Sequence, residues 1–269
     1  MGQKTKIDWC DATWNPVTGC LHGCEYCYAR KIARRFGKSD DEVQATHVVR
    51  YRRKNWRFKF DGNRFMPVGN PVPAPYPYGF DPTMYYYKLE EPQHWVKPRT
   101  IFVCSMADLF GEWVPYEWIR DVFKACEEAP QHRYMFLTKN PSRYIELYYA
   151  GLVLPNYIDW WYGYTVDGLK GFPEHAPIKQ RTFVSVEPIQ CELDSETIEN
   201  ITKTSWVIIG AETGRRKGKV IPQKAWIDTI VAECDKAGIP VFMKNSLREI
   251  MSDNFRQAFP WEVQIENEQ

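Results

Sequence analysis

Residues 205–244 read SWVIIGAETGRRKGKVIPQKAWIDTIVAECDKAGIPVFMK, and this stretch decides the fold class. The apolar run SWVIIGAE (205–212) predicts a buried strand. The segment 222–238 predicts a helix, because Pro222 stands at its start and Gly238 at its end. The run IPVFMK (239–244) predicts the next strand. A strand, a helix and a second strand in succession indicate one unit of a parallel α/β sheet.

The same alternation extends over most of the chain. Further strands are predicted at 100–105, 133–138, 160–166 and 181–188. Further helices are predicted at 26–37, 115–129, 141–151 and 194–202. With a short first strand before Cys20, this gives six strands and a terminal one. We therefore expect an α/β fold, a partial (β/α)6 TIM-like barrel of parallel strands, in a single domain over residues 1–269.

Composition excludes several classes of protein. The 269 residues carry 35 basic and 34 acidic side chains, so no global charge argues for nucleic acid or an anionic membrane. No apolar stretch reaches the roughly 18 residues of a membrane span. The N-terminus, MGQKTKIDWCDATW, lacks the apolar core of a secretory signal. The sequence predicts a cytoplasmic protein without membrane contact, in which a tight cysteine cluster is typical of metal binding.

That cluster is CLHGCEYCY (20–28), in which Cys20, Cys24 and Cys27 have the spacing C-x3-C-x2-C. A structural zinc site uses four ligands, usually as two pairs, and a second pair is missing here. Cys10 is near enough in sequence to complete a tetrad. Three thiolates on one short loop suit a [4Fe–4S] cluster with one iron left open. The remaining cysteines stand alone in apolar or amphipathic segments and are expected in the core: Cys104, Cys126, Cys191 and Cys234.

This cysteine spacing, with Tyr26 before the last cysteine, resembles the radical SAM motif. The surrounding segments IDWCDATWNPVTGC, VCSMADLFGEWVP, FLTKNPSRY, FVSVEPI and VIIGAETG resemble a phage-associated radical SAM family of unknown function, DUF5131-like, outside roughly residues 40–75. The resemblance implies a [4Fe–4S] cluster on Cys20, Cys24 and Cys27, whose open iron chelates S-adenosylmethionine (SAM). It also implies reductive SAM cleavage, hydrogen abstraction from a substrate, and an external electron donor of flavodoxin or ferredoxin type. Cys10 stands where the resemblance suggests threonine, so we read it as a bystander.

Polar residues follow each predicted strand, where the chemistry of parallel α/β folds gathers. The residues expected to contact the cofactor are Tyr26, Ser105, Asp108, Tyr164, Thr165, Glu187 and Gly210. Of these, Ser105 and Asp108 suit the SAM ammonium, whereas Gly210 permits close backbone approach to adenine. The others suit the ribose, the carboxylate or the ammonium. The candidate catalytic residues, which could bind anions or exchange protons, are Lys139, Lys244 and Glu212.

The insertion at 40–75 differs in composition from the rest. Residues 47–65 (HVVRYRRKNWRFKFDGNRF) interleave basic and aromatic side chains, and WRFKF followed by DGN predicts a hairpin. A Pro-rich, extended segment follows. Basic and aromatic residues together suit phosphates and stacked bases. The predicted nucleic-acid contacts are Arg52, Arg53, Lys54, Trp56 and Arg57. The alternative is a surface hairpin whose arginines cover aromatic faces.

Three functions remain open on the sequence. The first is a radical SAM enzyme acting on a nucleic acid or nucleotide. The second is a radical SAM enzyme acting on a peptide, protein or small metabolite. The third is a non-enzymatic module that binds a structural zinc or a nucleic acid.

Overall fold

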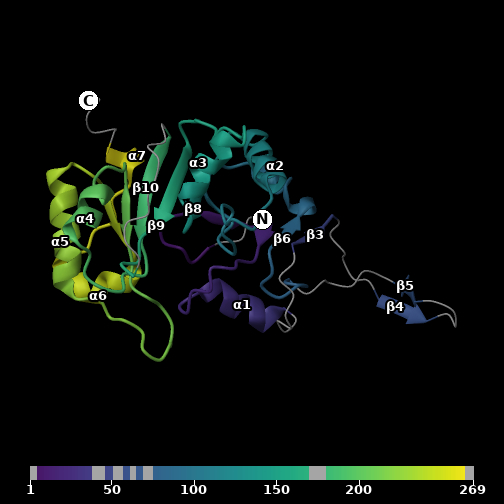
Figure 1. Cartoon of the computed structure of the whole chain (residues 1–269), viewed down its shortest axis with the longest axis horizontal. Coiled ribbons are helices and arrows are strands. Elements are labelled where there is room, and N and C mark those ends of the chain that lie inside the picture. The colour runs from purple at the N-terminus through teal and green to yellow at the C-terminus, as the bar shows by residue number, and fades with distance from the viewer. Residues whose placement is uncertain are drawn as a thin grey trace. The chain divides into compact units, whose positions relative to one another are not determined.

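The computed structural model describes residues 5–37, 46–50, 75–169 and 180–263, and the backbone alone of 57–60, 65–68 and 263 (Figure 1). The chain divides into two compact units. The sheet unit comprises Met1–Thr13, Lys97–Val103 and Pro130–Gln269. The cysteine unit comprises Trp14–Val96 and Cys104–Ala129.

A seven-stranded sheet forms the centre of the fold, in the order β1-β7-β8-β9-β10-β11-β12. All neighbouring pairs from β7 to β12 are parallel. The predicted partial TIM-like barrel is therefore confirmed as a parallel half-barrel sheet surrounded by helices. The strands are β1 (Ala12–Trp14), β7 (Thr100–Val103), β8 (Arg133–Thr138), β9 (Trp160–Thr165), β10 (Arg181–Val186), β11 (Val207–Ile209) and β12 (Val241–Met243).

Helices connect successive strands at the predicted places, although the described residues between β9 and β10 contain none. Pro115 and Pro141 occupy the N-cap positions of the first two, and the Asp194 carboxylate caps the third by accepting from the Thr197 N–H at 2.7 Å. In the part of the chain that is described, no helix is long and apolar enough to cross a membrane. The helices are α2 (Tyr116–Glu127), α3 (Ser142–Tyr149), α4 (Ser195–Ile201), α5 (Lys224–Lys236), η3 (Asn245–Leu247), α6 (Arg248–Met251), η4 (Ser252–Asn254) and α7 (Pro260–Val263).

Both faces of the sheet are buried, as is usual for parallel strands. On one face, Val207 and Ile209 pack with Ile227 and Ile230 of α5, and Figure 1 shows α5 beside α4. On the other face, Ile208 belongs to a core that is mainly aromatic. Its buried members are Trp9, Phe102, Met135, Trp161, Phe183, Trp206, Ile208 and Phe242.

The cysteine unit contains a small sheet of order β2-β6-β3, which the sequence analysis missed. Its strands are only two or three residues long, too short to produce a readable alternation. Besides α2, the described elements of this unit include β2 (Val17–Thr18), α1 (Tyr28–Phe36), β3 (His47–Val49), β6 (Thr83–Tyr85), η1 (Tyr86–Lys88) and η2 (Pro92–His94).

The insertion contains the expected pair of antiparallel strands. In β4 (Arg57–Phe60) and β5 (Phe65–Val68), Phe60 lies opposite Phe65. The predicted turn residues 61–63 lie outside the described residues.

Candidate metal centre

The three clustered cysteines lie on the loop that joins β2 to α1. The loop begins at Gly19, whose φ is +90° and whose hypothetical Cβ would be 2.1 Å from the Asp81 carbonyl oxygen, so only glycine fits there. The N–H of Gly19 donates to the Met106 carbonyl at 2.9 Å, and that of Cys20 donates to the Phe80 carbonyl at 3.1 Å. Backbone hydrogen bonds thus attach the start of the loop to two distant segments.

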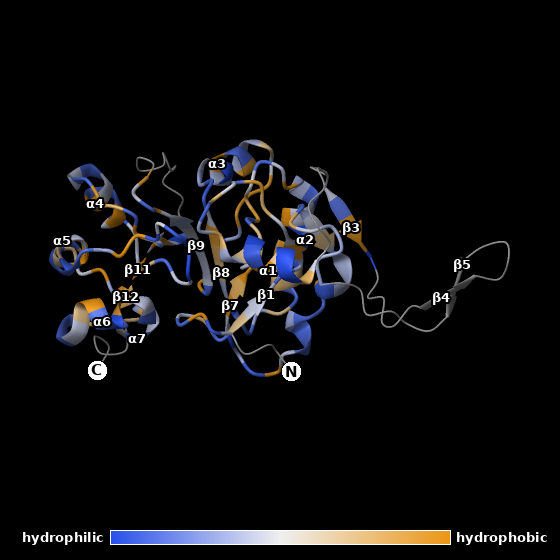
Figure 2. Cartoon of the chain, turned by 90° about the horizontal axis from the view of Figure 1, so that it is seen from below, coloured by the Kyte–Doolittle hydropathy of each residue, from blue (hydrophilic) through white to orange (hydrophobic). Residues whose placement is uncertain are grey.

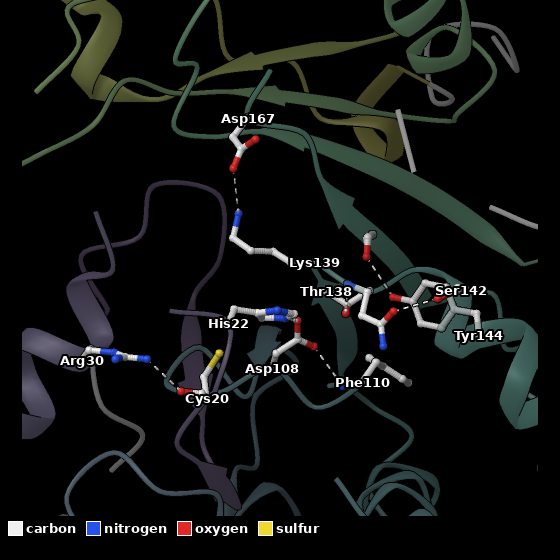
Figure 3. Close-up of polar contacts among 12 residues, drawn as sticks. Cys20, His22, Arg30, Asp108, Phe110, Thr138, Lys139, Ser142, Tyr144 and Asp167 are labelled. Atoms are coloured by element: carbon white, nitrogen blue, oxygen red, sulfur yellow. Dashed lines mark hydrogen bonds and ion pairs between the residues drawn. The ribbon is translucent and has the colours of Figure 1, made fainter. Parts of the chain in front are cut away.

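The end of the loop is fixed by the first turn of α1. Cys27 is the N-cap residue of this helix, and its Sγ accepts a hydrogen bond from the Arg30 N–H at 3.3 Å. The Arg30 guanidinium reaches back and donates from Nη2 to the Cys20 carbonyl at 3.3 Å (Figure 3). Arg30 Nε is a buried donor with no hydrogen-bond acceptor among the described residues. A buried donor of this kind beside the cysteine loop is suited to an anionic group bound there.

His22, which the sequence analysis missed, links the loop to the segment after β7. Its Nε2 lies 2.7 Å from Asp108 Oδ2 (Figure 3). Trp113 packs edge-on against the imidazole. Asp108 is buried, and its Oδ1 accepts from the Phe110 N–H at 3.0 Å. The position of His22 between two of the cysteines was the only signal in the sequence, because its partner is 86 residues away.

Ser105 is held in the same region. Its hydroxyl donates to Asn15 Oδ1 at 3.2 Å, and its carbonyl accepts from the Tyr28 hydroxyl at 2.7 Å. The preceding residue, Cys104, has a φ of +58°, which is uncommon for a residue other than glycine and costs free energy. The structure therefore brings Ser105 and Asp108 together with the cysteine loop.

The three loop cysteines are the candidate ligands for a metal ion or an iron–sulfur cluster. None of the cysteines forms a disulfide, and the three on the loop are half-buried thiols. Among the described residues, no three His, Cys, Asp or Glu side chains are grouped to hold a single metal ion. A polynuclear cluster binds each thiolate through a different iron, so its ligands need not converge on one point. Three thiolates are one ligand short of a closed tetrahedral zinc site, whereas a [4Fe–4S] cluster with one open iron would need only three.

The surroundings of the sulfur atoms are also informative. Burial raises the pKa of the Cys20 thiol to about 12, although an N–H donated by His22 opposes the shift. A bound metal must displace the proton that this thiol holds at neutral pH, so binding releases a proton. Cys20 and Cys27 pack against Phe80 and Met106, which shield the sulfur atoms on one side. Apolar packing and N–H donors to sulfur are features that tune thiolate-bound clusters.

Cys104, Cys126 and Cys234 are buried as predicted, whereas the prediction of a core position is wrong for Cys191. Cys126 and Cys234 are fully buried, and burial raises the pKa of both thiols, which makes them poor nucleophiles. Cys10 lies in the sheet unit, where burial raises its pKa to about 12. Cys191 is half-buried, and its Sγ donates to the Gly168 carbonyl at 3.1 Å.

In the sheet unit, Glu187, Gly210 and Lys244 lie together at the ends of β10, β11 and β12. Lys244 Nζ forms an ion pair with Glu187 Oε1. A hypothetical Cβ on Gly210 would lie 3.0 Å from Lys244 Cδ and 3.2 Å from Glu187 Cδ. A glycine thus leaves room for the ion pair, and the contact of Gly210 with adenine stays a prediction.

The other strand-end candidates have partners of their own. Lys139 Nζ is 3.9 Å from Asp167 Oδ2 (Figure 3), and the buried Glu212 accepts two hydrogen bonds from Arg216, each of 2.7 Å. Tyr164 is buried, which raises the pKa of its hydroxyl, and its neighbour Thr165 is half-buried. The bidentate arginine occupies both carboxylate oxygens of Glu212 and fixes their orientation.

A family model described as a protein of unknown function, DUF5131, matches residues 4–257. The chain belongs to this DUF5131 family. No curated protein and no solved structure matches it significantly. The expected resemblance to DUF5131 is thus confirmed, while radical SAM chemistry and the phage association stay predictions.

The predicted nucleic-acid residues of this DUF5131 chain are not tested by the structure. Arg52, Arg53, Lys54 and Trp56 lie outside the described residues, and Arg57 is described only by its backbone in β4. Tyr26, predicted to contact the cofactor, is half-buried on the cysteine loop.

For the DUF5131 chain we expect Asp108→Ala to lower the free energy of unfolding by about 1–3 kcal/mol, because His22 and the Phe110 N–H both lose a buried acceptor. The matched control is Glu112→Ala, which removes an exposed carboxylate four residues away and is expected to change stability by less than about 0.5 kcal/mol. Urea unfolding of both variants measures the difference. Equal midpoints for the two variants would show that the contact of Asp108 with His22 contributes nothing to stability.

Proposed function

We propose that the cysteine loop binds a [4Fe–4S] cluster and that the protein is an enzyme of radical SAM type. The observation that carries the proposal is the loop itself. Three half-buried thiols lie on one short loop before α1, two of the sulfurs accept from a backbone N–H, and the buried Arg30 Nε at this loop has no acceptor among the described residues. A structural zinc site would call for four protein ligands, usually as two pairs, whereas the loop supplies three cysteines.

In this proposal Cys20, Cys24 and Cys27 hold the cluster, and the iron without a protein ligand would bind SAM. The cluster and SAM, when both are bound, would supply one-electron chemistry that ends in the removal of a hydrogen atom from a substrate. The protein's own residues fix the loop, exclude water and position protons. Asp108 orients His22, the packing of Phe80 and Met106 keeps one side of the sulfur atoms dry, and the Arg30 guanidinium offers a positive charge.

The remaining strand-end residues have proposed roles as well. Ser105, Tyr164, Thr165 and Glu187 stay candidates for contact with SAM. Glu187 and Lys244 form an ion pair, so removal of either side chain leaves a part-buried charge without this partner. Lys139 is a candidate for a substrate anion. The electron comes from an external donor of flavodoxin or ferredoxin type.

Anaerobic reconstitution with iron and sulfide tests this function. We expect iron and acid-labile sulfide in near-equal amounts, a change in the electron paramagnetic resonance spectrum of the reduced cluster when SAM is added, and slow release of 5′-deoxyadenosine. Substrate is then sought by mass spectrometry of a cell extract incubated with the reduced enzyme and SAM. Stoichiometric zinc without sulfide in protein purified anaerobically would instead establish the non-enzymatic module.

A further inference from the structure

Helix α1, which begins directly after Cys27, has an unusual distribution of charge. Four of its nine residues are basic and none is acidic, and Figure 2 shows hydrophilic residues along it. The chain as a whole has a net charge of only +1, so this positive charge is local. The exposed basic residues of the helix include Lys31 and Arg35.

The apolar residues of α1 are arranged the opposite way from those of an ordinary surface helix. The two small residues Ala29 and Ala33 are buried. The large residues Tyr28, Ile32 and Phe36 recur every fourth position and are 49%, 37% and 49% exposed. At 100° per residue, this stripe lies directly beside Lys31 and Arg35 on the solvent side of the helix. Single exposed apolar residues are common, but an aligned row next to cations indicates a contact surface.

Flat rings and cations continue beyond the end of α1. Gly37 forms a parallel bridge with Tyr76, which places the segment containing Tyr78 beside the end of the helix. Tyr78 is 43% exposed and stacks on His47 of β3 with 3.9 Å between ring centroids and 4° between planes. Directly after β3, the Arg50 guanidinium lies 5.2 Å from the centroid of the Tyr86 ring. His47 and Arg50 belong to the insertion at 40–75, and α1 ends shortly before it.

We propose that Lys31, Arg35, Phe36 and Tyr78 form a surface that binds single-stranded nucleic acid, hereafter the α1 surface. Cations beside exposed aromatic faces match the two parts of a single strand, since phosphates need positive charge and unpaired bases need flat rings. The guanidinium of Arg35, 5.3 Å from the centroid of the Phe36 ring, shows that this ring already accepts a planar cationic neighbour.

Two other anionic partners fit less well. A membrane surface favours a longer helix with aliphatic residues inserted in the bilayer, whereas α1 has only nine residues and two of its three exposed apolar residues are aromatic. An acidic protein partner would bind to the basic side chains, but it would not require the row of exposed aromatic rings. The inference goes beyond the proposed metal centre, and it rests on the proposed function only in that the bound strand would then be the substrate.

Fluorescence anisotropy with a labelled single-stranded DNA or RNA of mixed sequence tests the α1 surface. We expect the double variant Lys31→Glu/Arg35→Glu of the full chain to bind about tenfold or more weakly at low salt, with a plot of log K against log salt less steep by about 1.4. The matched control, Lys97→Glu/Lys124→Glu, makes the same charge change at exposed lysines outside this surface and should bind like the parent. Thermal melts verify that all variants are folded.

Two single variants separate stacking from charge. Phe36→Ala is expected to weaken binding about fivefold to 150-fold with an unchanged salt slope, and Phe36→Trp should restore it. Equal binding by the parent and the Lys31→Glu/Arg35→Glu protein would overturn the inference. So would a parent that binds vesicles of phosphatidylserine and phosphatidylcholine but no oligonucleotide. Because binding needs neither reductant nor SAM, its failure is distinguishable from failure of the metal centre, which iron and sulfide analysis reports.

Discussion

Replacing Cys24 by alanine abolishes the bound iron and acid-labile sulfide after anaerobic reconstitution, if the loop holds a cluster as proposed. Cys24 supplies one of only three thiolates, and its carbonyl also accepts from the Cys27 N–H at 3.2 Å. A three-ligand site cannot lose a thiolate and keep three irons attached to protein. The expected result is complete loss of the visible absorption of the cluster and of any SAM cleavage, while the protein remains folded.

The matched control for that experiment is Cys126→Ala in α2. Cys126 is fully buried in the same unit, so its removal leaves a small cavity and should lower stability by roughly 1 kcal/mol without affecting iron content. Retention of a redox-active cluster in the Cys24→Ala protein would falsify the assignment of ligands. Loss of iron in both variants would show that the experiment measures unfolding and not ligation.

The second large effect is on stability. Trp206→Ala is expected to lower the free energy of unfolding by about 3–5 kcal/mol, the usual cost of removing a fully buried tryptophan. Trp206 is completely buried in the aromatic core of the sheet unit, where its ring lies 5.3 Å from that of Trp261 and 6.0 Å from that of Phe242. Its indole N–H donates to the Ala258 carbonyl at 2.9 Å. The loss is a large part of the roughly 5–15 kcal/mol that stabilises a typical domain.

Denaturant unfolding of three proteins measures this prediction. Trp206→Phe keeps a ring in the core but loses the indole donor, and it should fall between the parent and Trp206→Ala. Val96→Ala changes a side chain that is 91% exposed and should be neutral. A cost below about 1 kcal/mol for Trp206→Ala would mean that the core collapses around the missing ring.

The central sheet was predictable because the signal for each strand is local. Short apolar runs predicted every strand from β7 to β12, and a proline marks the start of α2, α3 and α5 between them. The predicted ends of the strands were less accurate. The strand expected at 100–105 stops at Val103, because Cys104 adopts a positive φ. The small sheet of the cysteine unit and the division into two units depend on distant contacts, which leave no periodic pattern.

The sequence by itself determined the α/β sheet and the three-cysteine loop, because periodicity and cysteine spacing are properties of neighbouring residues. Only the tertiary structure decided which side chains these features meet. His22 could be paired with Asp108, and Glu187 with Lys244, only once distant segments had packed together. The same holds for α1, whose pattern alone would allow its large apolar residues to be buried. Which face of a helix contacts the core depends on the partner that the fold provides. In α1 the residues that pack into the core are Ala29 and Ala33.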